Sequence, residues 1–315
     1  MELICNMADS SKPQIALITG ATGFIGSRLA RRLLREQWEV HVITRQQSSL
    51  ALLGEIIEEI EQHYYDHTTE SLVDIVDAVQ PDIVFHLASL TLANHTAADI
   101  RPLIESNVLL GTQLLEAMHI QGVCRLINTG TFWQHFNNAS YNPVCLYAAT
   151  KQAFDAIITY YVESATFNVI TLSLFDTYGE NDPRPKLLNQ LQSARQSNKP
   201  LAMSPGDQLI DLVHVDDVVE AFVLAAERLQ ASDGVGHVEY AVSSGNPISL
   251  RELVALYEEI AGATLPIIWG GRPYRDREVM VPWNTGKCLP GWVPRILIRE
   301  GLTRLLINPL DHQGR

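Results

Sequence analysis

Tyr147 and Lys151 form the pair whose residue types and spacing could most readily do chemistry. They lie four residues apart, so on a helix their side chains share one face. A free tyrosine has a pKa of about 10 and is a poor acid or base at neutral pH. A lysine ammonium, like an oxidised nicotinamide ring, favours the phenolate and lowers that pKa. The pair therefore predicts proton transfer, although a tyrosine at an interface beside an unrelated lysine has the same spacing.

Thr131 follows an apolar run at residues 123–129 that is typical of a buried strand. At the end of such a strand its hydroxyl could donate a hydrogen bond to the substrate oxygen that Tyr147 serves. The three residues together fit hydride transfer to or from a carbonyl group. In this interpretation Tyr147 moves the proton and Thr131 orients the carbonyl. Lys151 lowers the pKa of the phenol and holds the ribose of a nicotinamide cofactor.

A loop for that cofactor is predicted near the start of the chain. Residues 15–19 are a short apolar run, glycines follow at positions 20, 23 and 26, and an amphipathic helical pattern comes next. A glycine triplet alone marks only a tight turn, but strand, glycine turn and helix together indicate a dinucleotide-binding loop. The free N–H groups at the helix start bind the pyrophosphate. We expect cofactor contacts at Gly20, Thr22, Gly23, Phe24, Ile25 and Gly26.

The adenosine end of the cofactor is expected near two further strand ends. Arg45 follows the alternating strand pattern of residues 39–44. An acid there would bind the ribose 2′-hydroxyl, whereas a cation accommodates a 2′-phosphate. Arg45 therefore favours NADP(H) over NAD(H), although a solvated arginine at a strand end is the alternative. Asp66 follows residues 62–65 and could meet the adenine amino group or simply form a turn.

Small residues follow a fourth apolar run, residues 82–87, in which His86 is expected to be a core histidine. Small side chains there would let the backbone pass close to the nicotinamide half of the cofactor. Further cofactor contacts are expected at Leu87, Ala88, Ser89, Asn107, Tyr147 and Lys151.

Strand and helix patterns alternate along the first half of the chain. This alternation predicts an α/β fold with a doubly wound parallel sheet of the Rossmann type, with ligands at the carboxyl ends of its strands. The expected strands are residues 15–19, 39–44, 62–65, 82–87, 123–129 and 169–175, and the expected helices include residues 71–79, 104–118 and 147–163.

The pattern changes after residue 175, where prolines cluster around a helix at residues 186–196. Residues 209–215 and a helix at 216–229 are expected to return to the sheet domain. Another helix at 249–261 starts with Ser249 and Glu252 in a capping box. We expect a loose tail at 1–12, a dinucleotide-binding domain at 13–176 plus about 209–242, and a smaller C-terminal substrate-binding lobe. That lobe comprises 177–208 plus about 243–315.

Composition excludes several classes of protein. The chain has 315 residues and a net charge of −13, which argues against nucleic acid or an anionic membrane surface as partner. No apolar run approaches the ~18 residues of a membrane span, and no signal peptide is visible at the start. The four cysteines are scattered, which predicts reduced thiols, no metal site and a cytoplasmic protein.

Five motifs occur in the order seen in extended short-chain dehydrogenases/reductases. They are GATGFIG at 20–26, HLAS at 86–89, NVLLGT at 107–112, YAATK at 147–151 and LVHVDD at 212–217. The chain resembles the branch called the NAD-dependent epimerase/dehydratase family from about residue 14 to 301. That resemblance implies a nucleotide-sugar substrate and a homodimer.

Departures from the family pattern narrow the activity that the resemblance implies. Phe132 and Trp133 stand where dehydratases of this family carry Asp-Glu, so a dehydratase of the usual kind is excluded. Asp176 replaces an asparagine near the sugar diphosphate. Lys186 matches a basic residue aimed at the pyrophosphate, and Arg272 or Arg275 is expected to replace a family arginine missing before LVHVDD. The alternative for these basic residues is simple solvation.

The run LFDTYGENDPRPKLL at residues 174–188 is most similar to bacterial 4-ketoreductases such as the CDP-abequose and CDP-paratose synthases. This similarity implies NADPH-dependent reduction of the 4-keto group of a nucleotide-linked deoxyhexulose. Three alternatives stay open: a nucleotide-sugar epimerase with tightly bound NAD, an NADPH reductase of a non-sugar ketone, and a non-catalytic nucleotide sensor.

Overall fold

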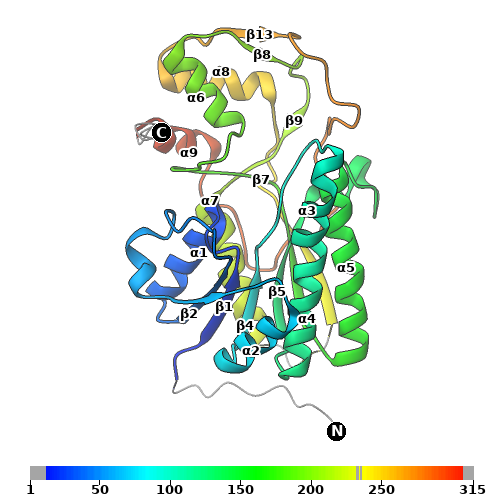
Figure 1. The fold of residues 1–315 in the computed structure, drawn as a ribbon. Helices are drawn as coiled ribbons and strands as arrows, with labels where there is room; N and C mark the ends of the chain where they lie inside the picture. Colours follow the sequence, from blue (N-terminus) through cyan, green and yellow to red (C-terminus); the bar gives the residue numbers. More distant parts are fainter. Residues whose placement is uncertain (1–11, 232–233, 235, 308–315) are drawn as a thin grey trace.

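The centre of the fold is a sheet of seven parallel strands in the order β11-β6-β5-β4-β1-β2-β3 (Figure 1). The computed structural model describes residues 12–231, 234 and 236–307. Most of the expected tail therefore lies outside the described residues. The strands are β1 Ile15–Thr19, β2 Glu39–Thr44, β3 Glu61–Tyr64, β4 Ile83–His86, β5 Arg125–Thr131, β6 Asn168–Leu174 and β11 Gly236–Val242. The prediction of a doubly wound parallel sheet is confirmed.

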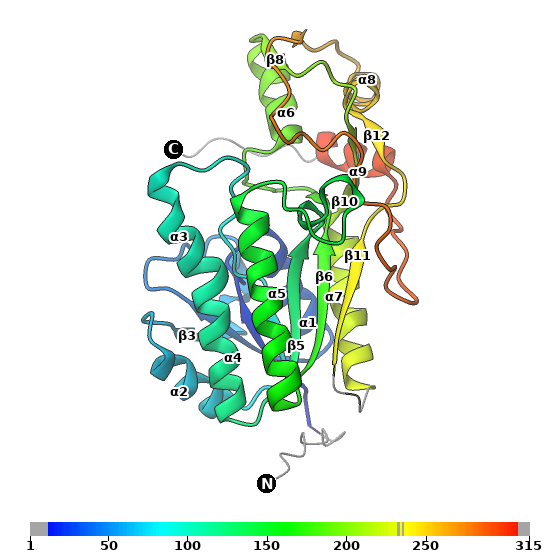
Figure 2. The ribbon, with the colours of Figure 1, turned by 90° about the vertical axis from the view of Figure 1, so that its right-hand side faces the viewer.

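Helices cover both faces of this sheet, as Figure 2 shows. On one face α1 (Phe24–Arg35) packs beside α7 (Val215–Gln230) over the first apolar core. On the other face α2 (Thr69–Val79), α4 (Leu110–Ile120) and α5 (Leu146–Ala165) enclose the second. Because both faces are buried, the central strands β1 and β4 read as continuous apolar runs rather than as alternating ones.

The helix expected at 104–118 is interrupted. The structure has α3 at Ile100–Ile104, a π-helical turn at Glu105–Leu109 and then α4. A π turn inserts one residue into the helical repeat and often marks a functional position. The apolar periodicity on either side is unbroken, so the sequence pattern did not reveal it.

Residues 209–214 pair outside the central sheet, whereas α7, which follows them, packs on the sheet beside α1. β9 (Leu209–Ile210) pairs with β12 (Ile248–Ser249), and β10 (Leu212–His214) pairs with β7 (Asp176–Tyr178). The edge position is taken instead by β11, which forms seven residue pairs along β6. β9 and β10 are too short to span that edge.

A third apolar core holds together a lobe above the carboxyl ends of the sheet strands (Figure 1). The lobe's regular elements are α6 Leu187–Ser197, β8 Leu201–Met203, α8 Leu250–Ala261, β13 Ile267–Trp269 and α9 Ile298–Ile307. Ser249 and Glu252 form the predicted capping box at the start of α8. Leu289 and Trp292, by contrast, pack into the first core beneath the sheet. Short 3₁₀ helices occur at Gly54–Glu58, Ala97–Asp99, Phe132–Gln134 and Phe136–Asn138.

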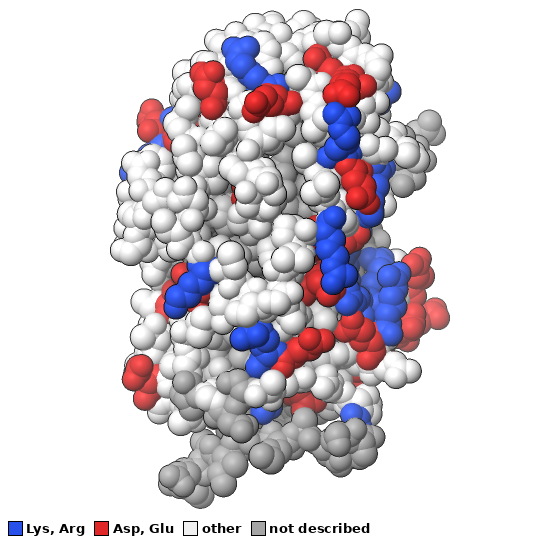
Figure 3. All heavy atoms as spheres, turned by 180° about the vertical axis from the view of Figure 1, so that it is seen from behind, with Lys and Arg blue, Asp and Glu red and all other residues white. Residues whose placement is uncertain are grey.

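Surface charges are paired rather than separated by sign. Figure 3 shows Lys and Arg side chains beside Asp and Glu along one side of the face that it presents. Arg32 on α1 pairs with Glu220 on α7, for example, at 2.7 Å. No helix in the part of the chain that the structure describes is long and apolar enough to span a bilayer.

The cysteines depart from the expectation of reduced thiols. Cys145 and Cys288 are free, whereas Cys124 takes part in a disulfide, so the prediction is wrong for Cys124. Wide spacing in sequence does not exclude a disulfide, because folding brings distant positions together. Cys5 lies outside the described residues.

Candidate active site

The glycine loop after β1 is held in a shape that side chains would not permit. Gly20 has φ +75°, and a Cβ there would lie 2.6 Å from the backbone nitrogen of Ala88. A Cβ at Gly26 would approach the Gly20 carbonyl oxygen to 2.2 Å. Gly23 is the residue before α1 and donates its N–H to the Gly20 oxygen at 3.0 Å. Thr22, Phe24 and Ile25 complete the loop and the first turn of α1, whose N–H groups face the carboxyl end of the sheet.

This loop lies at the point where the strand order of the sheet reverses. β1 is flanked by β4 on one side and β2 on the other, and ligands of doubly wound folds bind at that switch point. The end of β4 reaches the loop, because the Ala88 N–H donates to the Thr19 hydroxyl at 3.2 Å and Leu87 N–H to the Thr19 carbonyl at 3.1 Å. Leu87 and Ala88 therefore lie against the loop, and their contact with the cofactor remains a prediction.

Asn107 holds the segment after β4 against the helices. Its side-chain oxygen accepts from the N–H of Leu90 at 2.7 Å and from the hydroxyl of Ser89 at 3.2 Å. Its amide nitrogen donates to the Leu90 carbonyl at 3.0 Å and the Thr150 hydroxyl at 2.9 Å. These bonds occupy the buried side chain, so Asn107 positions Ser89 from the π turn; its predicted contact with the cofactor remains a prediction.

Tyr147 and Thr131 meet at the end of β5. The Tyr147 side chain is buried, and the hydroxyls of Thr91, Thr131 and Ser89 lie close enough to its own to lower its pKa. Burial raises the pKa of Tyr147, and these hydroxyls only partly oppose it. We predicted a lowered pKa from Lys151; the direction is wrong for the protein without its cofactor, because removal from water outweighs the nearby donors.

Lys151 lies one turn further along α5 and is 2% exposed. Among the described residues its ammonium nitrogen has no hydrogen-bond partner. Burial lowers the pKa of Lys151 to about 8, while the charge of Asp155 acts in the opposite direction. A buried ammonium without a partner is costly, and the hydroxyl groups of a ribose are acceptors that would satisfy it. The donor set therefore fits the nicotinamide ribose.

A polar network that the sequence analysis missed lies beneath Lys151. Asp155 accepts hydrogen bonds from Gln134 at 2.7 Å and from Asn128 at 3.3 Å. Burial raises its pKa to about 7, and Glu239 adds to the shift. Asp155 sits four residues after Lys151, so the helical spacing that singled out Tyr147 could also have found it.

Trp133 lies beside Tyr147. Its ring lies edge-on to that of Tyr147, with centroids 6.4 Å apart, and the Arg275 guanidinium lies over the Trp133 ring at 5.4 Å. Phe132 points into the first core and stacks on Phe175 at 4.6 Å. Neither ring can exchange a proton, which agrees with the exclusion of a dehydratase mechanism.

The predicted substrate residues are brought together only in part. Asp176 is close enough to Lys186 and Arg275 for their charges to lower its pKa, although burial raises that pKa overall. Burial also lowers the pKa of Lys186. Arg275 is held by Glu278 through two hydrogen bonds of 2.7 and 3.1 Å. Arg272 is exposed, and its positive charge helps to lower the pKa of Glu278. Arg275 is therefore the better placed of the two to face a substrate.

Arg184 lies within the run at residues 174–188, and we predicted no role for it from the sequence. Its guanidinium lies over the Phe24 ring at 4.7 Å, beside the start of α1, and is paired with Asp182 at 2.6 Å. It connects the lobe to the phosphate-binding loop. The prolines at positions 183 and 185 mark its turn, but the contact with Phe24 depends on tertiary packing.

Arg45 and Asp66 lie at the ends of β2 and β3, where the adenosine was expected. Arg45 is exposed. Asp66 is exposed too, and it accepts from the N–H of Thr68 at 2.9 Å and from its hydroxyl at 2.6 Å. These bonds lower the pKa of Asp66. Asp66 thus forms the turn before α2, which was one of its two predicted roles.

A family model described as the NAD dependent epimerase/dehydratase family matches residues 16–240. The chain belongs to this family. The match spans β1 to β11 and includes Tyr147, Lys151 and the glycine loop.

Relatives with different names match this chain. A CDP-abequose synthase of Yersinia pseudotuberculosis is 30% identical over 84% of this chain and 90% of its own length. A UDP-glucose 4-epimerase of Streptomyces lividans is 25% identical over 88% of this chain and 91% of its own. Among solved structures, a Thermus thermophilus UDP-glucose 4-epimerase in complex with NAD superposes with a TM-score of 0.79 at 22% identity, covering 94% of this chain and 98% of that one. That likeness shows the fold.

Proposed function

We propose that this protein reduces the 4-keto group of a nucleotide-linked deoxyhexulose with NADPH. The observation that supports the chemistry best is the meeting of the Tyr147 and Thr131 hydroxyls, one helical turn from the partnerless ammonium of Lys151. A carbonyl oxygen placed between the two hydroxyls would receive one proton and one hydrogen bond. This arrangement suits the reduction of a ketone.

The cofactor supplies the hydride when it is bound. Two side chains of the protein act on the carbonyl oxygen of the substrate. Tyr147 donates its proton as this oxygen gains negative charge, and Thr131 donates a hydrogen bond to it. The raised pKa of Tyr147 keeps the phenol protonated and therefore ready to act as an acid. The Lys151 ammonium then lies one turn from the phenolate that remains and favours it electrostatically.

NADP(H) is the proposed cofactor, in preference to NAD(H). Arg45 is exposed at the end of β2 and has no acidic residue beside it in sequence, so it can meet a 2′-phosphate. Titration of the protein with NADPH and NADH tests this choice. We expect tighter binding of NADPH, and we expect Arg45→Ala to remove that preference while leaving the affinity for NADH unchanged. Equal affinities in the unaltered protein would contradict it.

The proposed substrate is a nucleotide sugar. The family relatives named CDP-abequose synthase and UDP-glucose 4-epimerase support this class. Asp176, Lys186 and Arg275 are proposed to face the substrate, because Asp176 interacts with both cations and Arg275 lies over the Trp133 ring. Incubation with NADPH and CDP-, GDP-, dTDP- and UDP-linked 4-keto sugars, followed by loss of NADPH absorbance, tests the proposal. A reductase of non-sugar ketones would ignore all four.

A nucleotide-sugar epimerase is the second candidate. Relatives named UDP-glucose 4-epimerase and solved structures that contain NAD favour it. Such an enzyme would convert its substrate without net consumption of cofactor and would hold NAD through purification. Denaturing the purified protein and measuring released NAD separates the two: we expect little bound NAD, and a full equivalent would favour the epimerase.

We further propose a cytoplasmic homodimer. Apolar side chains of α3, the π turn, α4 and α5 remain exposed on the single chain, among them Ile104, Leu109, Ile120 and Tyr160 at 43–65%. A second copy packing helix against helix would cover them. Light scattering at several protein concentrations tests this proposal, with a stable mass of one chain as the contrary result.

A further inference from the structure

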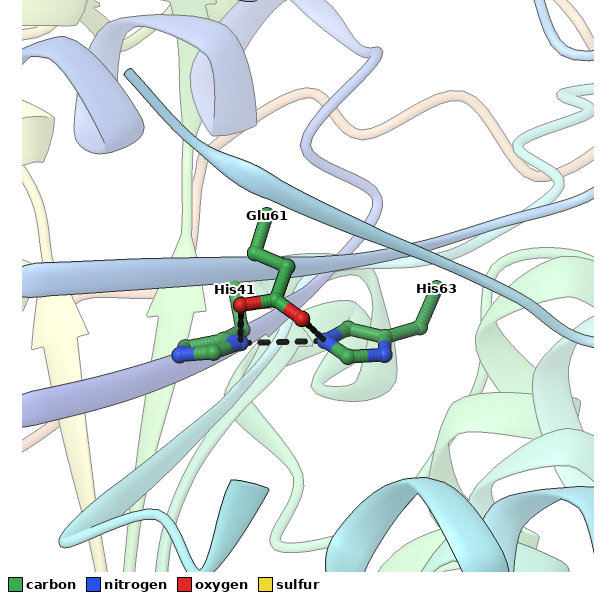
Figure 4. Close-up of side chains that lie close together, drawn as sticks. All are labelled: His41, Glu61 and His63. Carbon is green, nitrogen blue, oxygen red and sulfur yellow. Dashed lines mark hydrogen bonds and ion pairs between the residues drawn. The ribbon is translucent and has the colours of Figure 1, made fainter. Parts of the chain in front are cut away.

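Two histidines and a glutamate meet at the far edge of the sheet, away from the catalytic tyrosine (Figure 4). His41 is on β2, and Glu61 and His63 are on β3, the terminal strand. His41 lies opposite Glu61 in the parallel register. Because alternate residues of a strand share a face, Glu61 and His63 point to the same side, and the figure shows all three side chains turned toward one point.

The distances among their donor atoms approach those of a metal site. His41 Nδ1 lies 3.0 Å from His63 Nε2. The Glu61 oxygens lie 3.7 Å from His41 Nδ1 and 4.0 Å from His63 Nε2. Ligand atoms about 2.0–2.2 Å from a tetrahedral zinc ion stand roughly 3.3–3.5 Å apart. The two nitrogens need separate by only a few tenths of an ångström, and because the two Glu61 distances involve different oxygens, a rotation of this exposed side chain would bring one oxygen to that spacing from both nitrogens.

Glu39 supports this arrangement from behind His41. Its carboxylate lies 2.9 Å from His41 Nε2, so that nitrogen carries the proton and donates it. The lone pair of Nδ1 then faces the other two residues. A carboxylate bonded to the outer nitrogen of a histidine is the usual support of a metal-binding imidazole, since it fixes the tautomer and the ring.

We propose that His41, Glu61 and His63 bind a divalent transition-metal ion, with zinc the best match. Two imidazole nitrogens and one carboxylate oxygen suit zinc, with a water molecule as the fourth ligand. The Glu61 side chain is 66% exposed, which gives the ion and the water a path from solvent. The sequence analysis predicted no metal site, because the two histidines are 22 residues apart and only the pairing of β2 with β3 joins them.

The ion fastens the terminal strand. β3 is bonded to the sheet on one side only, through β2, and an ion bound by both strands would hold that edge. Two strands, β1 and β4, separate β2 from β5 and Thr131, so the ion is not part of the proposed chemistry. Metal binding should therefore raise thermal stability and leave turnover unchanged.

Equilibrium dialysis of the chelator-treated protein against Zn²⁺ tests the site. The unaltered protein should take up about one equivalent with a raised unfolding temperature, and Co²⁺ should give the visible absorption of a tetrahedral ion. His63→Gln should bind at least about tenfold more weakly, and Glu61→Gln, which keeps the shape of the side chain, should also weaken binding. His95→Gln is the matched control, because His95 is an exposed histidine outside the cluster.

Equal zinc uptake by the unaltered protein and His63→Gln would overturn the proposal, as would the absence of uptake. In either case the two histidines would form only a hydrogen-bonded pair. Circular dichroism of each variant without metal shows whether it is folded. Because none of these readouts uses cofactor or substrate, failure here is distinguishable from failure of the proposed reductase activity.

Discussion

The buried cation of the sheet domain and the cations of the lobe differ in their hydrogen-bond partners. Lys151 is buried in α5, and its nitrogen has no hydrogen-bond partner within the described residues. Arg184 and Arg275 are each held by an acid of their own, Asp182 and Glu278, through paired hydrogen bonds. The first arrangement leaves a donor ready for a ligand that always binds in the same place. The second keeps charges in position, and a phosphate arriving there must share or replace the acid.

This difference predicts which substitutions affect chemistry, cofactor binding and folding. Changes at Tyr147 and Lys151 in the sheet domain should reduce activity or cofactor affinity and leave the folded state intact. Changes to the paired cations of the lobe should weaken the fold and substrate binding, and leave cofactor affinity intact.

The largest effect is expected for Tyr147→Phe. Loss of the proton donor should lower turnover by about 10²–10⁴-fold, while NADPH affinity stays within about twofold, because the phenyl ring keeps its packing against Trp133. Steady-state reduction of a 4-keto nucleotide sugar and a binding titration measure the two quantities. Tyr160→Phe on the same helix is the control, since that ring is 65% exposed. Equal turnover of both variants would make this protein a binding protein.

Asp155 should make stability depend on pH. Its pKa is about 3.8 when unfolded and is raised to about 7 by burial. The folded state prefers the protonated form of Asp155. The stabilisation that Asp155 contributes is therefore fully present below about pH 4 and is lost as the pH rises through about 7. Three pKa units correspond to at most about 4 kcal/mol.

Urea unfolding of the unaltered protein and Asp155→Asn at pH 4.5 and 7.5 measures that contribution. The asparagine variant should gain stability relative to the unaltered protein as the pH rises. If the free energies of unfolding of the two proteins differed by the same amount at both pH values, Asp155 would be ionised throughout. Its environment would then not differ in this respect from that of the lobe acids.

Lys151→Met should separate binding from folding. Methionine keeps the packing but removes the ammonium, so NADPH affinity should fall by at least tenfold, or about 1.4 kcal/mol. The free energy of unfolding without cofactor should stay equal or rise, because a partnerless buried charge is removed. Fluorescence titration and urea unfolding give both values. Marked destabilisation would mean that Lys151 is already satisfied by Asp155.

Arg275→Gln should give the reverse pattern and the smallest effect. Its loss leaves Glu278 without its ion pair, which should cost about 1 kcal/mol or less for a pair at this degree of exposure. NADPH affinity should not change, while the KM for the nucleotide sugar should rise. The same two assays apply, and a loss of NADPH affinity equal to that of Lys151→Met would refute the contrast.

Sequence reasoning recovered those parts of the site that depend on local geometry. The bounds of β1 and β2, the glycine loop and the capping box at Ser249 each follow from residues within one or two turns of each other. That Tyr147 and Thr131 lie close together could be predicted from the rule that the carboxyl ends of parallel strands share one edge of the sheet.

The rest depended on packing between distant segments. The π turn contains Asn107, whose side chain bonds the Leu90 backbone, a contact that no periodicity encodes. The pairing of β10 with β7, the position of Arg184 over Phe24 and the direction of the Tyr147 pKa shift likewise follow from tertiary neighbours.

The most direct test of the account follows the hydride. NADPH carrying deuterium at the reactive nicotinamide carbon, mixed with the protein and a 4-keto nucleotide sugar, should yield a sugar with one deuterium at C4 for each NADPH oxidised. Tyr147→Phe should form that product far more slowly. A product without deuterium, or conversion with the label retained in the cofactor, would contradict the assignment of this site to ketone reduction.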